Sequence, residues 1–209
     1  MSGGLQDDMT SPIGSTVPRG VITVIAGCMF SGKTTELFRR FAEFSPSSIL
    51  VFKHVIDRRY RADAVVSHDG EAWPAIQIAS ADEIMDHIRP GIEVIAVDEA
   101  HFFDVSLVDV TRELAGRGIS VITTSLDRDS WGHPFAVAEG LCAIADELIV
   151  KYAVCAKCGV VADRTQRFTP IIDGNMVGGP ESYEARCQKC WVPPPEPAPN
   201  DTEVQAAKE

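Results

Sequence analysis

The segment 27–34 reads G-C-M-F-S-G-K-T and matches the phosphate-loop pattern G-x-x-x-x-G-K-[ST] at every fixed position. Such a loop directs backbone N–H groups and the positive end of a helix dipole at one point, where a triphosphate binds. We expect Lys33 to reach the β and γ phosphates and the Thr34 hydroxyl group to bind Mg²⁺. The predicted nucleotide-binding residues of the loop are Gly27, Cys28, Met29, Phe30, Ser31, Gly32, Lys33 and Thr34.

The segments on either side of this loop support the interpretation. Residues 21–26 are apolar and predict a buried strand, and residues 35–41 predict the first turns of a helix. A strand followed by a glycine turn and a helix is the context in which a phosphate loop works. This context favours a phosphate loop over a glycine-rich turn that matches the pattern by chance.

Two carboxylates follow a second apolar segment. Residues 92–97 predict a strand, and Asp98 and Glu99 come directly after it. In phosphate-loop proteins such a strand lies beside the loop, and its Asp helps to hold Mg²⁺. Glu99 would then lie near the γ-phosphate, where a carboxylate can accept a proton from an attacking hydroxyl group or water. The alternative is a solvated acidic turn at the end of a strand.

Four of the six cysteines form two C-x-x-C pairs. The first pair is Cys155 and Cys158, and the second is Cys187 and Cys190. Four thiolates at these spacings suit tetrahedral Zn²⁺, which would organise a segment too small to have its own core. The long stretch between the pairs predicts a projecting loop. A redox-active pair is the alternative to this structural metal site.

Composition restricts the class of protein. The chain has 209 residues, 45% of them hydrophobic, which is typical of a globular protein. Its net charge of −11 argues against binding to DNA or RNA duplexes, which needs clustered Lys and Arg. Without a signal core or an apolar run of bilayer length, we expect a cytoplasmic protein with no membrane partner and no disulfide framework. Cys28 and Cys142 are then packed or free thiols.

Apolar segments alternate with segments of helical pattern. This alternation predicts an α/β fold, with a parallel sheet covered by helices on both faces, of the RecA-like phosphate-loop type. Further strands are expected at 49–52, 119–124 and 147–150, and helices at 81–88, 105–116 and 135–143.

The chain divides into four parts by composition. Residues 1–19 are expected to form a flexible leader and residues 20–151 the α/β nucleotide-binding domain. Residues 152–191 are expected to form a small zinc-binding lid, because the pattern changes there to cysteine pairs and glycines. Residues 192–209 are rich in proline and acidic residues, which predicts a disordered tail.

Two function classes are compatible with the motifs. The run Asp98-Glu99-Ala100-His101 also occurs in helicase-type ATPases of the DExH kind, which usually need two motor domains and a basic nucleic-acid track. The other class transfers a phosphoryl group to a small acceptor and needs a compact lid over a pocket.

The chain resembles the thymidine kinase family of the zinc-containing, phosphate-loop type. The resemblance runs from about residue 21 to 190, and no helicase pattern explains the segments after Phe103. It rests on the phosphate loop, F-K at 52–53, D-R-R-Y at 57–60, S-H-D-G at 67–70, D-E-A-H-F-F at 98–103, L-D-R-D at 126–129, P-F at 134–135, V-G-G at 177–179 with Tyr183, and both cysteine pairs.

The resemblance implies ATP-dependent phosphorylation of the 5′-hydroxyl group of thymidine, giving dTMP in deoxynucleoside salvage, by a homotetramer. It implies that Glu99 is the general base. The ATP and Mg²⁺ site would comprise the loop together with Asp57, Arg59, Asp98, Glu99, Ala100 and His101. A lasso between the cysteine pairs would close over the nucleoside, and the substrate-binding residues would be Met29, Phe103, Leu126, Ser130, Thr165, Gly174, Asn175, Met176, Val177, Gly178 and Tyr183.

Three residues depart from the family pattern. Cys28 stands where proline is frequent, His101 where glutamine is usual, and Ser130 where an aromatic residue packs on the base. Loss of that ring removes stacking worth about 1 kcal/mol, although Trp131 could replace it if its direction changed. A nucleoside kinase with a shifted base preference, a catalytically weak paralogue, a zinc-containing nucleotide-binding protein and a single-domain ATPase are the alternatives.

Overall fold

The computed structural model describes residues 18–57, 63–67, 69–169 and 178–195. Within them, six strands form one parallel sheet in the order β5-β2-β6-β7-β1-β8. The predicted α/β fold is therefore confirmed. The strands are β1 (Ile22–Gly27), β2 (Ile49–His54), β5 (Ile76–Ile78), β6 (Val94–Asp98), β7 (Ser120–Ser125) and β8 (Glu147–Lys151), and the ends of those predicted lie within two residues of the expected ones.

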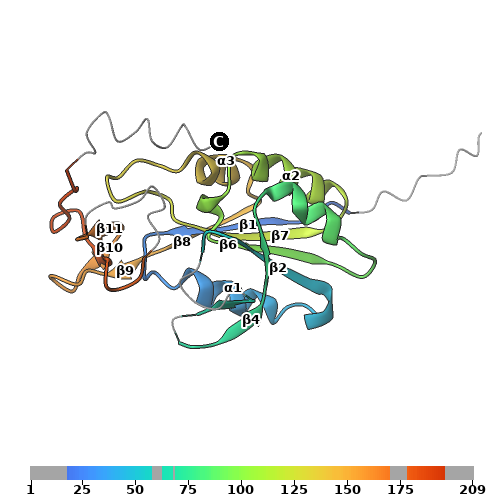
Figure 1. Ribbon diagram of the computed structural model, residues 1–209, viewed down its shortest axis with the longest axis horizontal. Coiled ribbons are helices and arrows are strands. Elements are labelled where there is room, and N and C mark those ends of the chain that lie inside the picture. Colours follow the sequence, from blue (N-terminus) through green and yellow to red (C-terminus); the bar gives the residue numbers. More distant parts are fainter. Residues whose placement is uncertain (1–17, 58–62, 68, 170–177, 196–209) are drawn as a thin grey trace, which may run out of the picture.

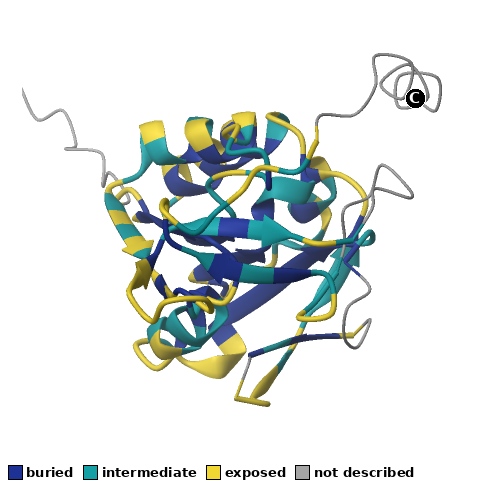
Figure 2. Ribbon diagram, turned by 90° about the vertical axis from the view of Figure 1, so that its left-hand side faces the viewer, coloured by how far each residue is buried: buried dark blue, intermediate teal, exposed yellow. Residues whose placement is uncertain are grey.

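Helices cover both faces of this sheet. α1 (Lys33–Phe41) lies on one face, and α2 (Ser106–Gly116) and α3 (Ala136–Ile144) lie on the other (Figure 1). Successive strand residues point to opposite faces, so Val24 packs under α2 and α3 while Ile25 packs under α1. This double burial explains why the inner strands are almost wholly apolar; Figure 2 shows them as a buried layer between more exposed ones.

The segment predicted as a helix over 81–88 is a 3₁₀-helix, η2 (Ala81–His87). It begins with a capping box between Ser80 and Glu83. Pro90 disfavours helical dihedral angles at Arg89, which leaves little room for a longer helix. Two further 3₁₀-helices are η1 (Pro46–Ser48) and η3 (Ala100–Phe102).

Among the described residues, six short strands lie outside the main sheet. β3 (Ala64–Val66) and β4 (Ala72–Pro74) form an antiparallel pair that packs on α1, with the Trp73 ring 4.8 Å from that of Phe41. β9 (Ala153–Val154) pairs with β10 (Val161–Ala162), and β11 (Arg164–Arg167) pairs with β12 (Tyr183–Arg186). The last four strands form the C-terminal unit, which follows β8 at the carboxyl end of the sheet (Figure 1). The described helices include none that is long and apolar enough to span a bilayer.

Candidate functional site

The phosphate loop connects β1 to α1 and lies at the carboxyl end of the sheet. A Cβ atom on Gly27 would lie 2.2 Å from the backbone oxygen of Lys151, so only glycine fits there. The buried Lys33 ammonium donates hydrogen bonds to the carbonyl oxygens of Gly27 (3.2 Å) and Cys28 (2.9 Å). Ser31 Oγ donates to the same Cys28 oxygen at 2.8 Å. These bonds hold the loop in a curve around the Lys33 side chain.

Asp98 and Glu99 are fixed by a residue that the sequence patterns do not single out, Thr124 at the end of β7. The Thr124 hydroxyl group donates to Asp98 Oδ1 at 2.5 Å and accepts a hydrogen bond from the Glu99 N–H at 3.0 Å. Glu99 has left-handed backbone dihedral angles (φ 52°, ψ 49°), which cost about 1 to 3 kcal/mol in a residue other than glycine. One hydroxyl group therefore binds the Asp98 carboxylate and the backbone of the strained turn at Glu99.

The strand that carries these carboxylates ends beside the phosphate loop, although it is not a direct neighbour of β1, because β7 lies between β6 and β1. Local patterns do not determine this strand order. The two motifs nevertheless meet in one cavity, because parallel strands bring their carboxyl ends to the same edge.

This cavity brings together most of the predicted nucleotide-binding residues. It also contains Lys53, whose ammonium lies 3.3 Å from Asp57 Oδ2. The site prediction lacks the lining residues Thr35, Lys53, Val65, Val66, Asp69, Gly179 and Pro180. The full lining is Met29, Phe30, Ser31, Gly32, Lys33, Thr34, Thr35, Lys53, Asp57, Val65, Val66, Asp69, Asp98, Glu99, Gly179 and Pro180.

His101 lies behind Glu99 and is not among the described residues that line the cavity. Its Nδ1 atom accepts a hydrogen bond from the Leu126 N–H at 3.2 Å and lies 3.3 Å from Glu99 Oε2. Its ring packs on Phe102 at 4.3 Å and on Phe135 at 5.0 Å. The neighbouring Ala100 is fully buried. His101 therefore supports the Glu99 turn from the side away from the cavity.

Of the predicted substrate-binding residues, Met29 lines the cavity; the other described ones are not among its lining residues. The Met29 N–H donates to Thr165 Oγ1 at 3.1 Å, which ties the phosphate loop to β11. Phe103 packs edge-on against His54, and Tyr183 Oη accepts a hydrogen bond from Arg167 at 2.8 Å. A Cβ atom on Gly178 would lie 3.0 Å from the Tyr183 ring. Arg59, Gly174, Asn175, Met176 and Val177 lie outside the described residues.

His54 holds the turn between β2 and Asp57 in its neutral form. Its Nε2–H donates to the Ala79 carbonyl oxygen at 3.0 Å, and its Nδ1 accepts from the Ile56 N–H at 3.2 Å. Burial lowers the pKa of His54, although the Ala79 carbonyl oxygen and the Asp104 charge oppose this. A protonated ring would lose the bond from Ile56.

We expect His54 to make the protein less stable in mild acid. Between the lowered folded pKa and the unfolded pKa of about 6.5, the unfolded chain binds more protons, so stability is complete above the unfolded value and falls below it. The contribution has a slope of up to about 1.4 kcal/mol per pH unit. Urea unfolding from pH 7.5 to 5.0 should show a smaller loss for His54→Asn, which keeps an acceptor for Ile56 but does not titrate. Equal losses in the two proteins would contradict this account.

The four paired cysteines form one cluster in the C-terminal unit. Their sulfur atoms all lie within 4.8 Å of one another, and those of Cys158 and Cys187 are 3.6 Å apart. Tetrahedral Zn²⁺ with Zn–S bonds of about 2.3 Å places its sulfur ligands about 3.8 Å apart, so the cluster fits this ion. The chemistry of the donors also fits, because thiolates are the ligands of closed structural zinc sites.

Ionisation within the cluster is unequal. Burial opposes ionisation of Cys155, yet the backbone N–H groups of Cys187, Lys157 and Cys158 lower the pKa of its thiol to about 6. The hydrogen bond with Cys158, together with burial, raises the pKa of Cys190 to about 12. Thiols this close cannot all ionise without a cation among them, which is the role that a zinc ion would fill.

Cys28 joins the phosphate loop to this cluster. Its thiol donates to the Ala162 carbonyl oxygen at 3.5 Å, and burial raises its pKa. It packs in a small core with Ala153, Cys155, Ala162, Ala185 and Cys187. Cys28 is thus a packed thiol, and its contact with Ala162 joins the loop to the C-terminal unit, as the bond from Met29 to Thr165 also does.

The family match covers the whole of this arrangement. The family described as thymidine kinase (TK) matches residues 20–191, which include the phosphate loop, both carboxylates and all four paired cysteines. The chain belongs to the thymidine kinase family. Among solved structures, the Legionella pneumophila ATPase DotB is similar over 69% of this chain, with 18% identity and a TM-score of 0.39. This chain spans 43% of the DotB chain, and so weak a likeness supports no conclusion about function.

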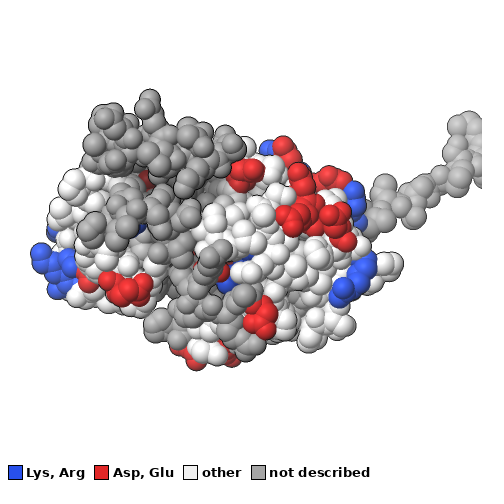
Figure 3. Space-filling model, in the orientation of Figure 1, with Lys and Arg blue, Asp and Glu red and all other residues white. Residues whose placement is uncertain are grey.

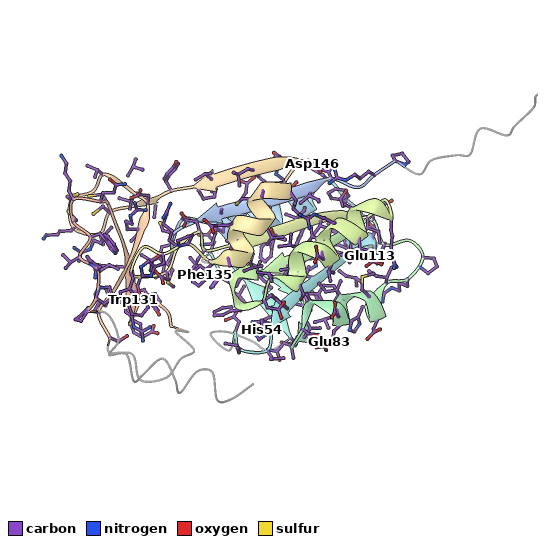
Figure 4. The ribbon with its side chains drawn as sticks, turned by 90° about the horizontal axis from the view of Figure 1, so that it is seen from above. His54, Glu83, Glu113, Trp131, Phe135 and Asp146 are labelled. Carbon is purple, nitrogen blue, oxygen red and sulfur yellow. The ribbon has the colours of Figure 1, made fainter. Side chains whose placement is uncertain are left out.

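One position at which the resemblance implied a departure from the family pattern, Ser130, lies in a turn with Trp131. Ser130 is buried, and the Trp131 ring is directed elsewhere. The Asp129 carboxylate fixes the turn by accepting from the Trp131 N–H (2.9 Å), and Trp131 Nε1–H donates to the Pro195 carbonyl oxygen (3.2 Å). Trp131 is thus directed toward the segment after the second cysteine pair, beside the C-terminal unit (Figure 4). Trp191 of that segment contacts Gly132, where a Cβ atom would lie 3.1 Å from its ring.

Proposed function

We propose that this protein transfers the γ-phosphoryl group of ATP to the 5′-hydroxyl group of thymidine and releases ADP and dTMP. The observation that carries the proposal is the cavity itself. In a kinase family member, it joins a phosphate loop, the carboxylates of Asp98 and Glu99 and the Gly179–Pro180 edge of the segment between the cysteine pairs. Phosphoryl transfer to a small acceptor needs these three parts together.

The loop and Lys33 hold the phosphates of ATP in the proposed reaction. The Thr34 hydroxyl group and the Asp98 carboxylate are oxygen donors of the kind that Mg²⁺ prefers, and they would hold it. Bound Mg²⁺ neutralises phosphate charge and orients the γ-phosphoryl group. Asp57 lies in the same cavity, beside the Lys53 ammonium group.

Glu99 takes the proton of the acceptor in this mechanism. The 5′-oxygen forms a bond to the γ-phosphorus as the bond from that phosphorus to the bridging oxygen of ADP breaks, and the 5′-proton passes to the Glu99 carboxylate. Thr124 keeps Glu99 in position during this step through the backbone bond at 3.0 Å. Gly179 and Pro180, at the cavity wall, would keep water from competing as acceptor.

We also propose an oligomeric state, a cellular location and a metal content. The protein would be a cytoplasmic homotetramer with a structural Zn²⁺ in each chain, and it would not bind nucleic-acid duplexes. On the face seen in Figure 3, the described residues show separate groups of acidic and basic side chains rather than a continuous basic track. Together with the net charge of −11, this supports a small-molecule acceptor.

The decisive experiment measures ADP formation from ATP and Mg²⁺ with each nucleoside in turn, and identifies the product by mass. We expect turnover that depends on thymidine and yields its 5′-monophosphate. Turnover with another nucleoside alone would keep the mechanism and move the base preference, which the buried Ser130 would then explain. ADP formation without any nucleoside but stimulated by DNA would contradict the proposal and favour an ATPase.

A further inference from the structure

Lys53 is the most deeply buried charged residue of the cavity. Its side chain is 1% exposed, yet the residue lines the cavity beside Asp57, Asp98 and Glu99. It lies on β2 and pairs in register with Asp98 on the neighbouring strand β6. Because the strands are parallel, both side chains belong to the same carboxyl edge of the sheet.

The partner of Lys53 is held by a built turn. Asp57 Oδ2 lies 3.3 Å from the Lys53 ammonium, and the Asp57 side chain is 4% exposed. The Asp57 N–H donates to the His54 carbonyl oxygen at 2.9 Å, and the Val55 N–H donates to the Ile78 carbonyl oxygen at 3.0 Å. The turn therefore fixes the carboxylate from the backbone side while Lys53 fixes it from the sheet.

Stability alone is a poor explanation for such a pair. Taking two charges out of water costs as much as their attraction returns, so that apolar residues of the same size often serve the fold equally well. Both charges also line a cavity that is already rich in charge, with Lys33, Asp69, Asp98 and Glu99 around it. A role in the reaction that takes place in the cavity explains this buried ion pair better than a contribution to stability does.

Strand order separates the two lysines of the cavity. Lys53 is on β2, the Asp98–Glu99 pair ends β6, and Lys33 follows β1, in the order β2-β6-β7-β1. The carboxylate pair thus lies between the two ammonium groups along the edge of the sheet. The Lys33 ammonium group is bonded to carbonyl oxygens of the phosphate loop. Lys53 therefore lies on the opposite side of Glu99 from this loop.

We propose that Lys53 is a positioning residue for the acceptor side of the reaction. It holds the Asp57 carboxylate in the cavity beside Glu99, and the pair orients the acceptor hydroxyl group for attack. This inference rests on the proposed phosphoryl transfer and adds a residue to it. Lys33 contributes to ATP binding, whereas the Lys53–Asp57 pair contributes to turnover and to binding of the acceptor.

The test compares Lys53→Met, Lys53→Arg, Asp57→Asn and the double variant Lys53→Met/Asp57→Asn with the zinc-loaded wild-type protein. For Lys53→Met we expect kcat to fall roughly 100-fold, as for a misplaced positioning group. We expect the Kd for ATP, from calorimetry without nucleoside, to change by less than about threefold, because the phosphate loop is intact. Lys53→Arg should recover most of the lost turnover. The kcat of the double variant should be no lower than that of the less active single variant, because the two residues act as a unit.

The matched control is Arg112→Met, which removes an exposed ion pair with Asp109 (2.8 Å) on α2. It should keep wild-type kcat. Wild-type turnover in folded Lys53→Met, multiplicative losses in the double variant, or a loss confined to ATP binding would each overturn the inference. If Lys53→Met does not fold, Lys53→Arg and Asp57→Asn decide by the same criteria. An inactive wild-type protein would instead overturn the proposed function, and this inference with it.

Discussion

Glu99→Gln should lower kcat by roughly 10²- to 10⁴-fold, the usual contribution of a general base. Glutamine keeps the size and the polarity of the side chain but cannot accept the proton of the acceptor hydroxyl group. The left-handed backbone at position 99 and its hydrogen bond to Thr124 involve no side-chain atom of Glu99, so both should persist. Steady-state kinetics with the active nucleoside, together with calorimetric titration of ATP, measure the two effects separately.

The binding of ATP is the internal control for this variant. Because Glu99 is placed to act on the acceptor, the Kd for ATP should stay within about threefold of the wild-type value. Glu113→Gln on the exposed face of α2 makes the same chemical change far from the cavity and should leave kcat unaltered. If Glu99→Gln turns over at the wild-type rate, Glu99 is not the base, and another group of the cavity must take the proton.

The sheet could be predicted because burial on both faces leaves a direct trace in the sequence. β1 and β6 are buried along their entire length, and near-continuous apolar runs of this kind are typical of parallel strands between two helical layers. The phosphate loop and the cysteine pairs were predictable for a related reason. Their chemistry needs particular residue types at fixed local spacing, and this spacing can be read directly from the sequence.

Contacts between distant segments could not be predicted in the same way. Thr124 reaches Asp98 and Glu99 only because β7 lies beside β6, and Lys53 reaches the same edge only because β2 lies on the other side. No local pattern determines which strands are neighbours. The polar run at the end of the buried strand β7 is the one signal that could have indicated Thr124, since ligand-facing residues collect at carboxyl ends.

The sequence motifs also could not predict the direction in which a side chain points. His101 adjoins the acidic motif in sequence, yet one left-handed residue, Glu99, turns the chain so that His101 lies behind it. Trp131 adjoins Ser130, yet the Asp129 turn directs it to Pro195. In both cases a single turn separates neighbours in sequence by placing them on different sides of the fold.

Cys187→Ser should release zinc and abolish most of the activity, because a zinc ion in the cysteine cluster would provide much of the stability of the C-terminal unit. The core of that unit consists of small residues, Cys28, Ala153, Cys155, Ala162, Ala185 and Cys187, which bury little apolar area. Structural zinc sites contribute on the order of 10 kcal/mol to the folding of such segments. Metal analysis should find less than stoichiometric zinc, and limited proteolysis should cleave within residues 152–191 much faster than in the wild-type protein.

The loss of turnover should follow from the two bonds that join this unit to the phosphate loop, Cys28 to Ala162 and Met29 to Thr165. Without an ordered unit, the loop loses its supports and Gly179 and Pro180 leave the cavity wall, so we expect kcat/KM to fall roughly 100-fold. Cys142→Ser is the matched control, because Cys142 lies on α3 outside the cluster; it should keep its zinc and its turnover. A Cys187→Ser protein that is free of metal but fully active would show that the cluster is not a structural zinc site, and that the phosphate loop does not depend on it.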